Sequence, residues 1–351
     1  MPLDFLMRLL SAPGPSGHET APAKVWRDYC TGFTNDVAAD NVGSSYARVA
    51  GRQNGPKLII VGHIDEIGLH ITHIDKDGYL RFGSVGGWDT IVLVGQRIRI
   101  HTREGDVVGV IARKPIHLLK DEERKSAPEI KDLHIDIGAK DAEEARQMVR
   151  IGDVGVIDAD PIELRSGLVL SRALDNRVGC YVAAEAARRV AEAGGAPGDV
   201  VGMAVVQEET GFGGSRTSAF SQDPDVAIAV DVTFATDQPG IELGQITEHA
   251  LGSGPVLTRG TTLHPRVFEL LYEAAERAGM SFTVESTGRG TGTDADAIHL
   301  SRAGIPTGLI SVPLRYMHSP VELGSLADMD AAAQLIADFA QLLSTGMSFE
   351  R

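Results

Sequence analysis

Two adjacent glutamates, Glu208 and Glu209, are the residues whose placement most directly suggests chemistry. They follow an apolar run over residues 200–206, which predicts a short buried strand, and they precede a glycine-rich stretch over residues 210–214. Neighbouring residues on a strand point to opposite sides, so the two carboxylates can hold different roles only where the backbone bends, and glycines permit a bend. A solvated strand end is the commoner explanation for such a pair, so its meaning depends on the rest of the chain.

A second candidate position follows the apolar run over residues 57–62, which leads into His63. Positions two apart on a strand face the same way, so Asp65 could orient the His63 ring through its second nitrogen, as carboxylates often do for metal-binding histidines. The spacing alone is not specific, because His134 and Asp136 repeat it. A solvent-facing pair at a strand end explains it equally well.

Three further residues of the same chemical kind lie at the boundaries of predicted elements. Asp231 ends the predicted strand over residues 226–230, and His318 lies at the exit of the predicted strand over residues 307–312. Asp175 stands where a long predicted helix begins, a position that suits either a helix cap or a metal ligand.

These candidates form a coherent set. Sites in α/β sheets gather at the carboxyl ends of strands, and unpaired buried charge is costly, which argues against an accidental meeting of such groups. Two histidines and three carboxylates suit a pair of divalent ions with one carboxylate bridging them. The six candidates are His63, Asp175, Glu208, Glu209, Asp231 and His318.

Two patterns of predicted secondary structure divide the chain into two domains. Helices alternate with buried strands over residues 1–68 and 165–351, which predicts an α/β catalytic domain. Between them, residues 69–164 contain short alternating stretches broken by glycines, which predict an inserted small β-barrel. The fold class expected is therefore an α/β sandwich with a β-barrel insertion.

The composition excludes several classes of protein. A formal net charge of −15 over 351 residues argues against nonspecific nucleic-acid binding. The two cysteines support neither a disulfide framework nor a cysteine zinc site. No signal peptide and no apolar run of membrane-spanning length is present, so we expect a cytoplasmic protein without a membrane partner. The glycine-rich stretches 211–214 and 288–292 lack the Lys-Ser/Thr that closes a phosphate-binding loop.

The combined motifs resemble those of the M42 family of dinuclear metallo-aminopeptidases, of the glutamyl and tetrahedral aminopeptidase type. The resemblance covers nearly the whole chain, and the motifs are specific together although each alone is weak. One departure is that residues 210–214 read Thr-Gly-Phe-Gly-Gly, where the family often has Val-Gly-Leu-Arg-Gly. The matching motifs are Gly-His-Ile-Asp-Glu-Ile-Gly at 62–68, Ile-Asp-Ile-Gly-Ala at 135–139, Leu-Asp-Asn-Arg at 174–177, Gln-Glu-Glu at 207–209, Val-Asp at 230–231, Gly-Thr-Asp-Ala at 292–295 and Met-His-Ser at 317–319.

The resemblance implies a role for each candidate. Glu208 would be the general base, Asp65 would be the partner of His63, and Asp175 would bridge two divalent ions, with a cis peptide bond following it. The ions would be Zn²⁺ or Co²⁺, with Mn²⁺ as an alternative, because His and carboxylate ligands suit all three. The implied metal ligands are His63, Asp175, Glu209, Asp231 and His318.

The resemblance also implies an activity and an assembly. The enzyme would hydrolyse the N-terminal residue from short peptides with a free N-terminus, using a water activated by the two metals. The inserted barrel over residues 69–164 would serve self-association into a dodecamer built from dimers.

Other functions remain open on the residues alone. A metal-dependent amidase or deacylase would use the same six residues. A glycosidase could use paired carboxylates, but it leaves His63 and His318 without a purpose. A structural shell with a vestigial site would bind no metal.

Overall fold

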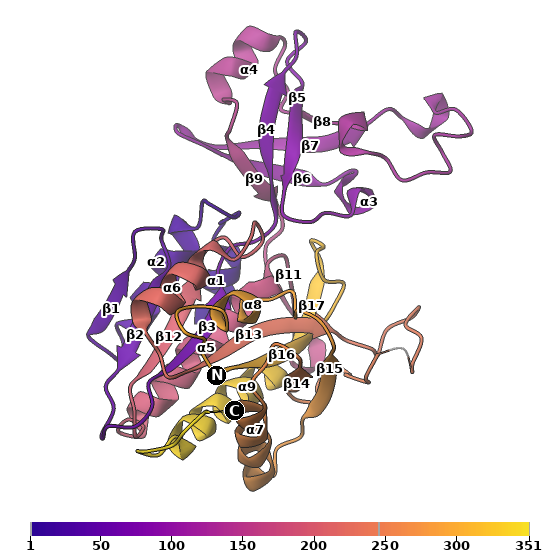
Figure 1. The fold of residues 1–351 in the computed structure, drawn as a ribbon. Coiled ribbons are helices and arrows are strands. Elements are labelled where there is room, and N and C mark those ends of the chain that lie inside the picture. The colour runs from indigo at the N-terminus through magenta and orange to yellow at the C-terminus, as the bar shows by residue number, and fades with distance from the viewer. Residues whose placement is uncertain (1, 245, 351) are drawn as a thin grey trace.

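The computed structural model describes residues 2–244 and 246–350, and it shows a large α/β body that carries a separate closed β-barrel (Figure 1). The chain passes from β3 (Leu58–His63) into the barrel and returns from it to β10 (Ile162–Leu164). The predicted fold class, an α/β body with a β-barrel insertion, is thereby confirmed.

The α/β body is built on one mixed sheet. Its remaining strands are β1 (Asp36–Ala39), β2 (Ser45–Val49), β11 (Leu168–Ser171), β12 (Val200–Val205), β13 (Val226–Phe234), β14 (Val256–Gly260), β15 (Thr283–Thr287), β16 (Thr307–Arg315) and β17 (Glu322–Ser325). The spatial order is β1-β2-β12-β3-β13-β16-β17-β11-β10, and β14 joins β16 while carrying β15. The central strands β12, β3, β13 and β16 are parallel, so their carboxyl ends meet at one edge of the sheet.

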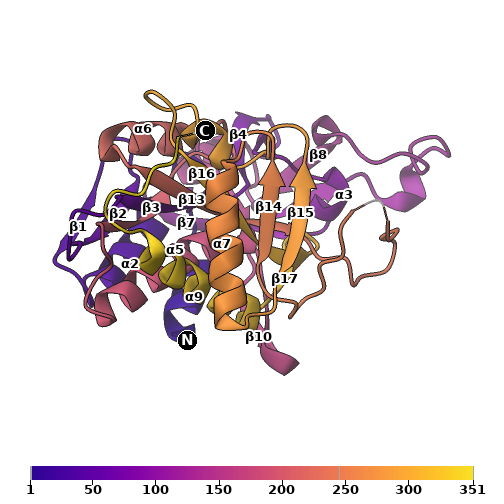
Figure 2. The same ribbon diagram turned by 60° about the horizontal axis from the view of Figure 1, so that its bottom comes forward.

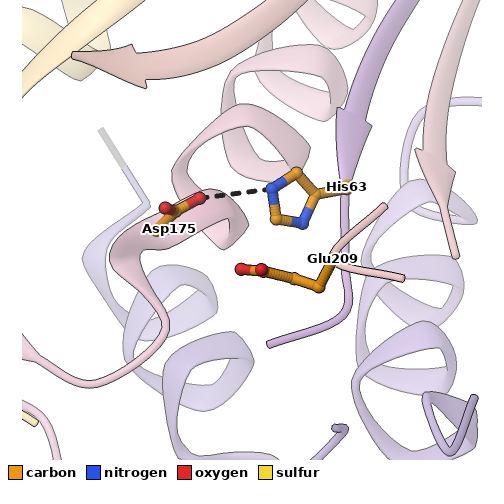
Figure 3. A group of neighbouring side chains, drawn as sticks. All are labelled: His63, Asp175 and Glu209. Carbon is orange, nitrogen blue, oxygen red and sulfur yellow. Dashed lines mark ion pairs between the residues drawn. The ribbon is translucent and has the colours of Figure 1, made fainter. Parts of the chain in front are cut away.

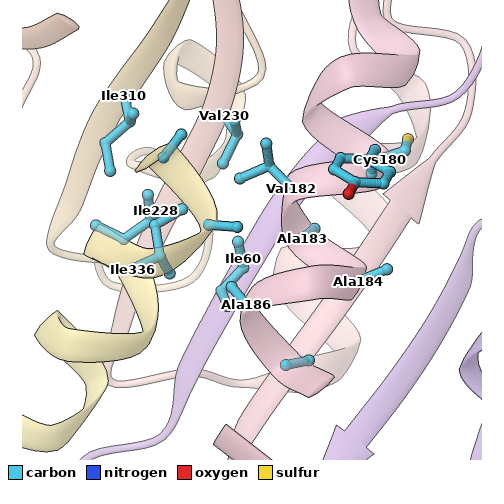
Figure 4. Packing of buried hydrophobic residues seen from close by; sticks show 14 of the residues in the cluster. Ile60, Cys180, Val182, Ala183, Ala184, Ala186, Ile228, Val230, Ile310 and Ile336 are labelled. Carbon is cyan, nitrogen blue, oxygen red and sulfur yellow. The ribbon is translucent and has the colours of Figure 1, made fainter. Parts of the chain in front are cut away.

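Helices cover both faces of this sheet, as buried parallel strands require. One face carries α1 (Leu3–Ser11), α2 (Thr20–Cys30), α5 (Leu174–Glu192), α7 (Pro265–Ala278) and α9 (Leu326–Leu342), and the other carries α6 (Gly213–Gln222) and α8 (Ala295–Ile298). Ile60 packs with α5 and α9 on the first face (Figure 4). Ile59 and Val61 belong to the cluster on the second face. Figure 2 shows α7 beside β14 and β15. Within residues 2–244 and 246–350, no helix has the length and apolar character needed to cross a bilayer.

Two glycines let β3 and α5 approach closely beside the candidate residues. A Cβ atom on Gly62 would lie 2.3 Å from the carbonyl carbon of Gly179, so any side chain at Gly62 would push the two elements apart. Gly62 immediately precedes His63, and Gly179 lies four residues after Asp175. The close contact therefore brings the end of β3 to the start of α5.

The barrel is a separate unit with its own apolar core. Ile98 and Ile100 are buried inside it while Arg97 is exposed, which is the alternation expected of a barrel strand. Its first and last strands are hydrogen-bonded neighbours in the circuit β4-β5-β8-β7-β6-β9. The elements are β4 (Gly68–Ile74), β5 (Leu80–Val85), α3 (Thr90–Leu93), β6 (Arg97–Thr102), β7 (Gly105–Arg113), β8 (Leu133–Asp136), α4 (Ala142–Met148) and β9 (Val154–Ile157).

The main differences from the sequence prediction concern strand ends. Asp231 lies inside β13 rather than at its end, because β13 and β16 continue to pair as far as Phe234 and Leu314. Strands β14 and β17 were not predicted; both are short, and β17 pairs antiparallel with β11 and β16.

Candidate active site

The candidate site lies where β3 and β13 separate at the carboxyl edge of the parallel strands. Their pairing ends with Val61 opposite Ala229, so His63 and Asp231 project where the strands diverge. β12 lies on one side of β3 and β13 on the other, and both come later in the chain. Such a reversal of strand order is the usual place for a binding site in an open α/β sheet.

Asp175 lies between the two histidines. Its Oδ1 atom is 3.2 Å from His63 Nε2, and its Oδ2 atom is 3.3 Å from His318 Nε2. Burial raises the pKa of Asp175, but the two histidines outweigh burial and hold that pKa below its usual range. Figure 3 shows the Asp175 carboxylate facing the His63 ring, with the Glu209 carboxylate extending toward the same space. His318 Nε2 also lies 3.6 Å from Glu209 Oε1.

Two overlapping groups of side chains could each hold a metal ion. In the first, one atom each from His63, Asp175 and Glu209 lies within 4.8 Å of the others. In the second, the same limit of 4.8 Å holds for His63, Glu208 and Asp231. The structure thus gathers all six candidates from distant parts of the chain, and the peptide bond after Asp175 is cis, as the resemblance implied.

Asp65 contacts the backbone of Glu208 and Glu209 as well as the ring of His63. Its carboxylate accepts the backbone N–H of Glu208 at 3.0 Å and that of Glu209 at 3.1 Å. Its Oδ1 atom also lies 3.5 Å from His63 Nδ1. The predicted backbone bend is present, because Gln207 has a positive φ of 59°. Asp65 therefore fixes the direction in which both glutamates leave the strand.

The site concentrates acidic groups away from water. Burial, together with neighbouring carboxylates, raises the pKa of Glu208 to about 10 and that of Glu209 to about 7. The same causes raise the pKa of Asp231 well above its usual value, and burial raises that of Asp294 to about 6. Buried carboxyl groups that repel one another in this way favour the arrival of a cation.

Glu322 is a supporting residue that the sequence analysis missed. It is buried, one carboxylate oxygen accepts the backbone N–H of Asp175, and the other accepts that of His318. Burial, with Asp175 adding to it, raises the pKa of Glu322 well above the usual value. The only sequence signal is its position four residues after His318.

A cavity of about 760 Å³ opens from this cluster. Its lining beyond the six candidates includes Thr233, His249, Thr258 and Glu285. None of these was predicted, because they come from β13, the segment before β14, β14 and β15, whose pairing only the fold reveals. The cavity is large enough for a small ligand, and it reaches the candidate metal ligands directly.

The departure from the family pattern at residues 210–214 has a local structural role. The hydroxyl of Thr210 hydrogen-bonds that of Ser16 at 2.8 Å, and Phe212 has a positive φ of 61° immediately before α6. Residues 210–214 are not among the described residues that line the cavity.

Comparison with known proteins places this architecture in a family. Residues 43–335 match the M42 glutamyl aminopeptidase family. A lysyl aminopeptidase of Pyrococcus furiosus is 36% identical over 95% of this chain and 94% of its own length. The TET aminopeptidase of a marine sediment Thaumarchaeota archaeon superposes with a TM-score of 0.92 at 36% identity, covering 98% of this chain and 96% of that chain.

A second solved structure, the dodecamer of PhTET1, superposes with a TM-score of 0.84 at 31% identity over 98% of this chain and 99% of that chain. The matches span both the α/β body and the inserted barrel. The chain is a member of the M42 aminopeptidase family.

Proposed function

We propose that the protein is a metal-dependent aminopeptidase that removes the N-terminal residue from short peptides, with Glu208 as the general base. The observation that carries this proposal is the placement of Asp175, whose two oxygens face the Nε2 atoms of two different histidines. A carboxylate held in this way suits two neighbouring divalent ions.

The donor set fits such ions. Two imidazoles and several carboxylates converge within metal-ligand reach, and no Lys or Arg is among the described residues that line the cavity. The raised pKa values of Glu209 and Asp231 reflect negative charge that lacks a counter-ion. These ligand types suit Zn²⁺, Co²⁺ and Mn²⁺.

The two histidines lie on opposite sides of Asp175, His63 against its Oδ1 atom and His318 against its Oδ2 atom. Asp231 would complete the donor set beside His63, and Glu209 lies within reach of both histidines. Asp65 and Glu322 keep these side chains in position through the backbone.

Glu208 is the group left to move protons. When bound, divalent ions would acidify a water molecule and polarise the scissile carbonyl. The Glu208 carboxylate lies 3.8 Å from His63 Nε2 and lines the cavity, where it would face an attacking water. With divalent ions bound, the pKa of Glu208 would fall from its raised value, because nearby cations favour the carboxylate. The carboxylate would then take the proton of that water and pass it to the leaving amine.

Exposed apolar residues on the barrel favour a role in self-association. Val108 and Val110 are exposed and lie two apart on β7, so they face the same way, and Ile91, Ile116 and Leu118 are also exposed. The similar PhTET1 structure is a dodecamer. We propose that the barrel, which lies mostly within residues 69–164, forms the assembly module of a dodecamer built from dimers. Light scattering at micromolar concentration should give a mass far above 37.3 kDa.

The experiment that tests the activity compares matched peptides with a free and an acetylated N-terminus, before and after dialysis against a chelator. We expect cleavage of the free peptides only, loss of activity without metal, and recovery when Zn²⁺, Co²⁺ or Mn²⁺ is returned. Cleavage of the acetylated peptides instead would favour a deacylase. Full activity after complete metal removal would contradict the proposal.

A further inference from the structure

Besides the proposed metal ligands and Glu208, the described lining of the cavity contains another carboxylate. Glu285, on β15, lines the same cavity as the cluster, and its side chain is 22% exposed there. The described lining residues include no Lys or Arg that could neutralise it. The wall of the cavity at Glu285 therefore presents a carboxylate to whatever enters.

Glu285 is held rigidly but keeps free acceptor capacity. Thr258, its direct neighbour across β14 and β15, donates its hydroxyl to Oε1 at 2.7 Å, and Thr233 donates to Oε2 at 3.1 Å. Each carboxylate oxygen can accept about two hydrogen bonds, so both oxygens can accept a further donor. A side chain fixed in this way loses little entropy when it binds a ligand.

The nearest imidazole does not cancel the charge of Glu285. His249 Nε2 lies 3.7 Å from Glu285 Oε2, and His249 Nδ1 lies 2.7 Å from Thr283 Oγ1. Burial lowers the pKa of His249 and outweighs the opposite effect of Glu285. Because the imidazole of His249 is neutral, it does not offset the negative charge that Glu285 presents to the cavity.

Glu285 lies at a short distance from the cluster. Thr233, which holds it, stands two residues after Asp231 on β13, and residues two apart on a strand share a face about 7 Å apart. A peptide whose α-amino group and first carbonyl lie at the cluster would direct its first side chain toward this wall. A long side chain with a terminal cation could span that separation.

We propose that Glu285 makes this cavity a binding site for a basic first residue, lysine or arginine. This proposal rests on the proposed aminopeptidase function. The ammonium or guanidinium would donate to the free acceptor sites of the Glu285 carboxylate, while apolar lining residues such as Phe234 and Met317 contact the aliphatic stem. An acidic first residue would face repulsion from the same group. The matching family is named for a glutamyl aminopeptidase, whereas this proposal expects an acidic first residue to be disfavoured.

The test compares lysyl and norleucyl chromogenic substrates, which share a four-carbon stem and differ in the terminal cation. For the metal-loaded wild type we expect kcat/KM to favour lysyl by about 10- to 100-fold, the range that a hydrogen-bonded charge contributes. Glu285→Gln should reduce that lysyl-to-norleucyl ratio by about tenfold or more. Glu248→Gln removes the same charge from an exposed neighbouring position outside the cavity lining and should leave the ratio unchanged.

Binding of free L-lysine and L-norleucine, measured by calorimetry on the same metal-loaded proteins, separates this proposal from the proposed activity. If no free aminoacyl substrate is cleaved, the aminopeptidase proposal fails, while tighter binding of lysine that depends on Glu285 still supports the site. A wild type that handles norleucine as well as lysine in both measurements overturns the inference, whether or not Glu285→Gln folds. So does a lysine preference that survives in Glu285→Gln.

Discussion

Glu322 accepts the backbone N–H of Asp175, with 3.0 Å between Oε2 and the nitrogen, across a sequence separation of 147 residues. Its other oxygen holds the N–H of His318 at 2.9 Å. We expect Glu322→Gln to weaken metal binding by about 10- to 100-fold, as changes to groups that orient metal ligands typically do. The amide nitrogen of glutamine cannot accept an N–H, so one of the two bonds must be lost. Competition against a chromogenic chelator measures the affinity.

A matched control for this variant is Glu163→Gln on the exposed strand β10. It removes the same charge from the surface and should leave metal affinity unchanged. Equal metal affinity in wild type and Glu322→Gln would show that Glu322 does not position the ligands.

The two adjacent glutamates should respond differently to the same substitution. Glu208→Gln keeps the shape of the side chain, so metal content should persist while turnover falls by about 10²–10⁴-fold, the usual contribution of a positioned acid–base group. Glu209→Gln replaces a charged oxygen donor with a neutral one, so metal occupancy should fall first. Elemental analysis together with steady-state kinetics distinguishes the two. An empty site in Glu208→Gln with both metals retained in Glu209→Gln would mean that the roles are reversed.

A buried ionic cluster beside the site should dominate the stability of this region. Arg177 is fully buried, pairs with Glu66 at 2.8 Å, and donates to the carbonyls of Leu9 and Ile64. Arg177→Met leaves Glu66 and these carbonyls short of donors, which should lower the free energy of unfolding by about 3–5 kcal/mol.

Urea unfolding measures this change. The control is Arg8→Met, because Arg8 and Asp4 form an exposed pair with side-chain exposures of 57% and 88%. That variant should change the free energy of unfolding by less than about 0.5 kcal/mol. Similar changes in the free energy of unfolding for Arg177→Met and Arg8→Met would show that burial does not determine the effect.

Glu19 should make stability depend on pH. Burial, with Asp65 adding to it, raises the pKa of Glu19 from 4.5 to about 7. The folded state therefore holds a proton that the unfolded state releases, and this stabilisation is complete below pH 4.5 and is lost as the pH rises through 7. Its Oε1 atom alone accepts the N–H groups of Gly17 and Gln207, and an amide keeps that oxygen.

Glu19→Gln should therefore become more stable relative to wild type between pH 5 and pH 8, by on the order of 2–3 kcal/mol. Urea unfolding at both pH values gives the comparison. Glu104→Gln, at an exposed turn of the barrel, should track the wild type. A constant difference between Glu19→Gln and wild type across this range would rule out the buried proton.

The sequence was informative where local pattern determines structure. The unbroken apolar run before His63 predicts a strand covered on both faces, and β3 is buried throughout. Because parallel strands share a carboxyl edge, His63 and Asp231 could be expected near one another. The same reasoning could not find Glu322 or Glu285, since their partners come from strands whose pairing depends on the whole fold.

Only one of the contacts of Asp65 could be predicted from nearby sequence. Spacing suggested its contact with the His63 ring, but its bonds to the Glu208 and Glu209 amides join segments 143 and 144 residues apart. The end of β13 shows the same limit, because its extension to Phe234 follows from continued pairing with β16 rather than from its own apolar run.

The pairing of β4 with β9 brings the two connections between the barrel and the α/β body side by side. The chain leaves the α/β body and returns to it through neighbouring strands, and the core of the barrel is separate from the cores of the body. A short linker between these two points could replace the barrel without removing any strand of the large sheet. The proposed assembly surface on the barrel can thus vary in evolution without altering the large sheet. The exception is the segment of Gly86 and Gly87, where a Cβ atom would lie 3.0 Å from Glu209 Oε2 and 3.5 Å from His318 Nδ1, respectively.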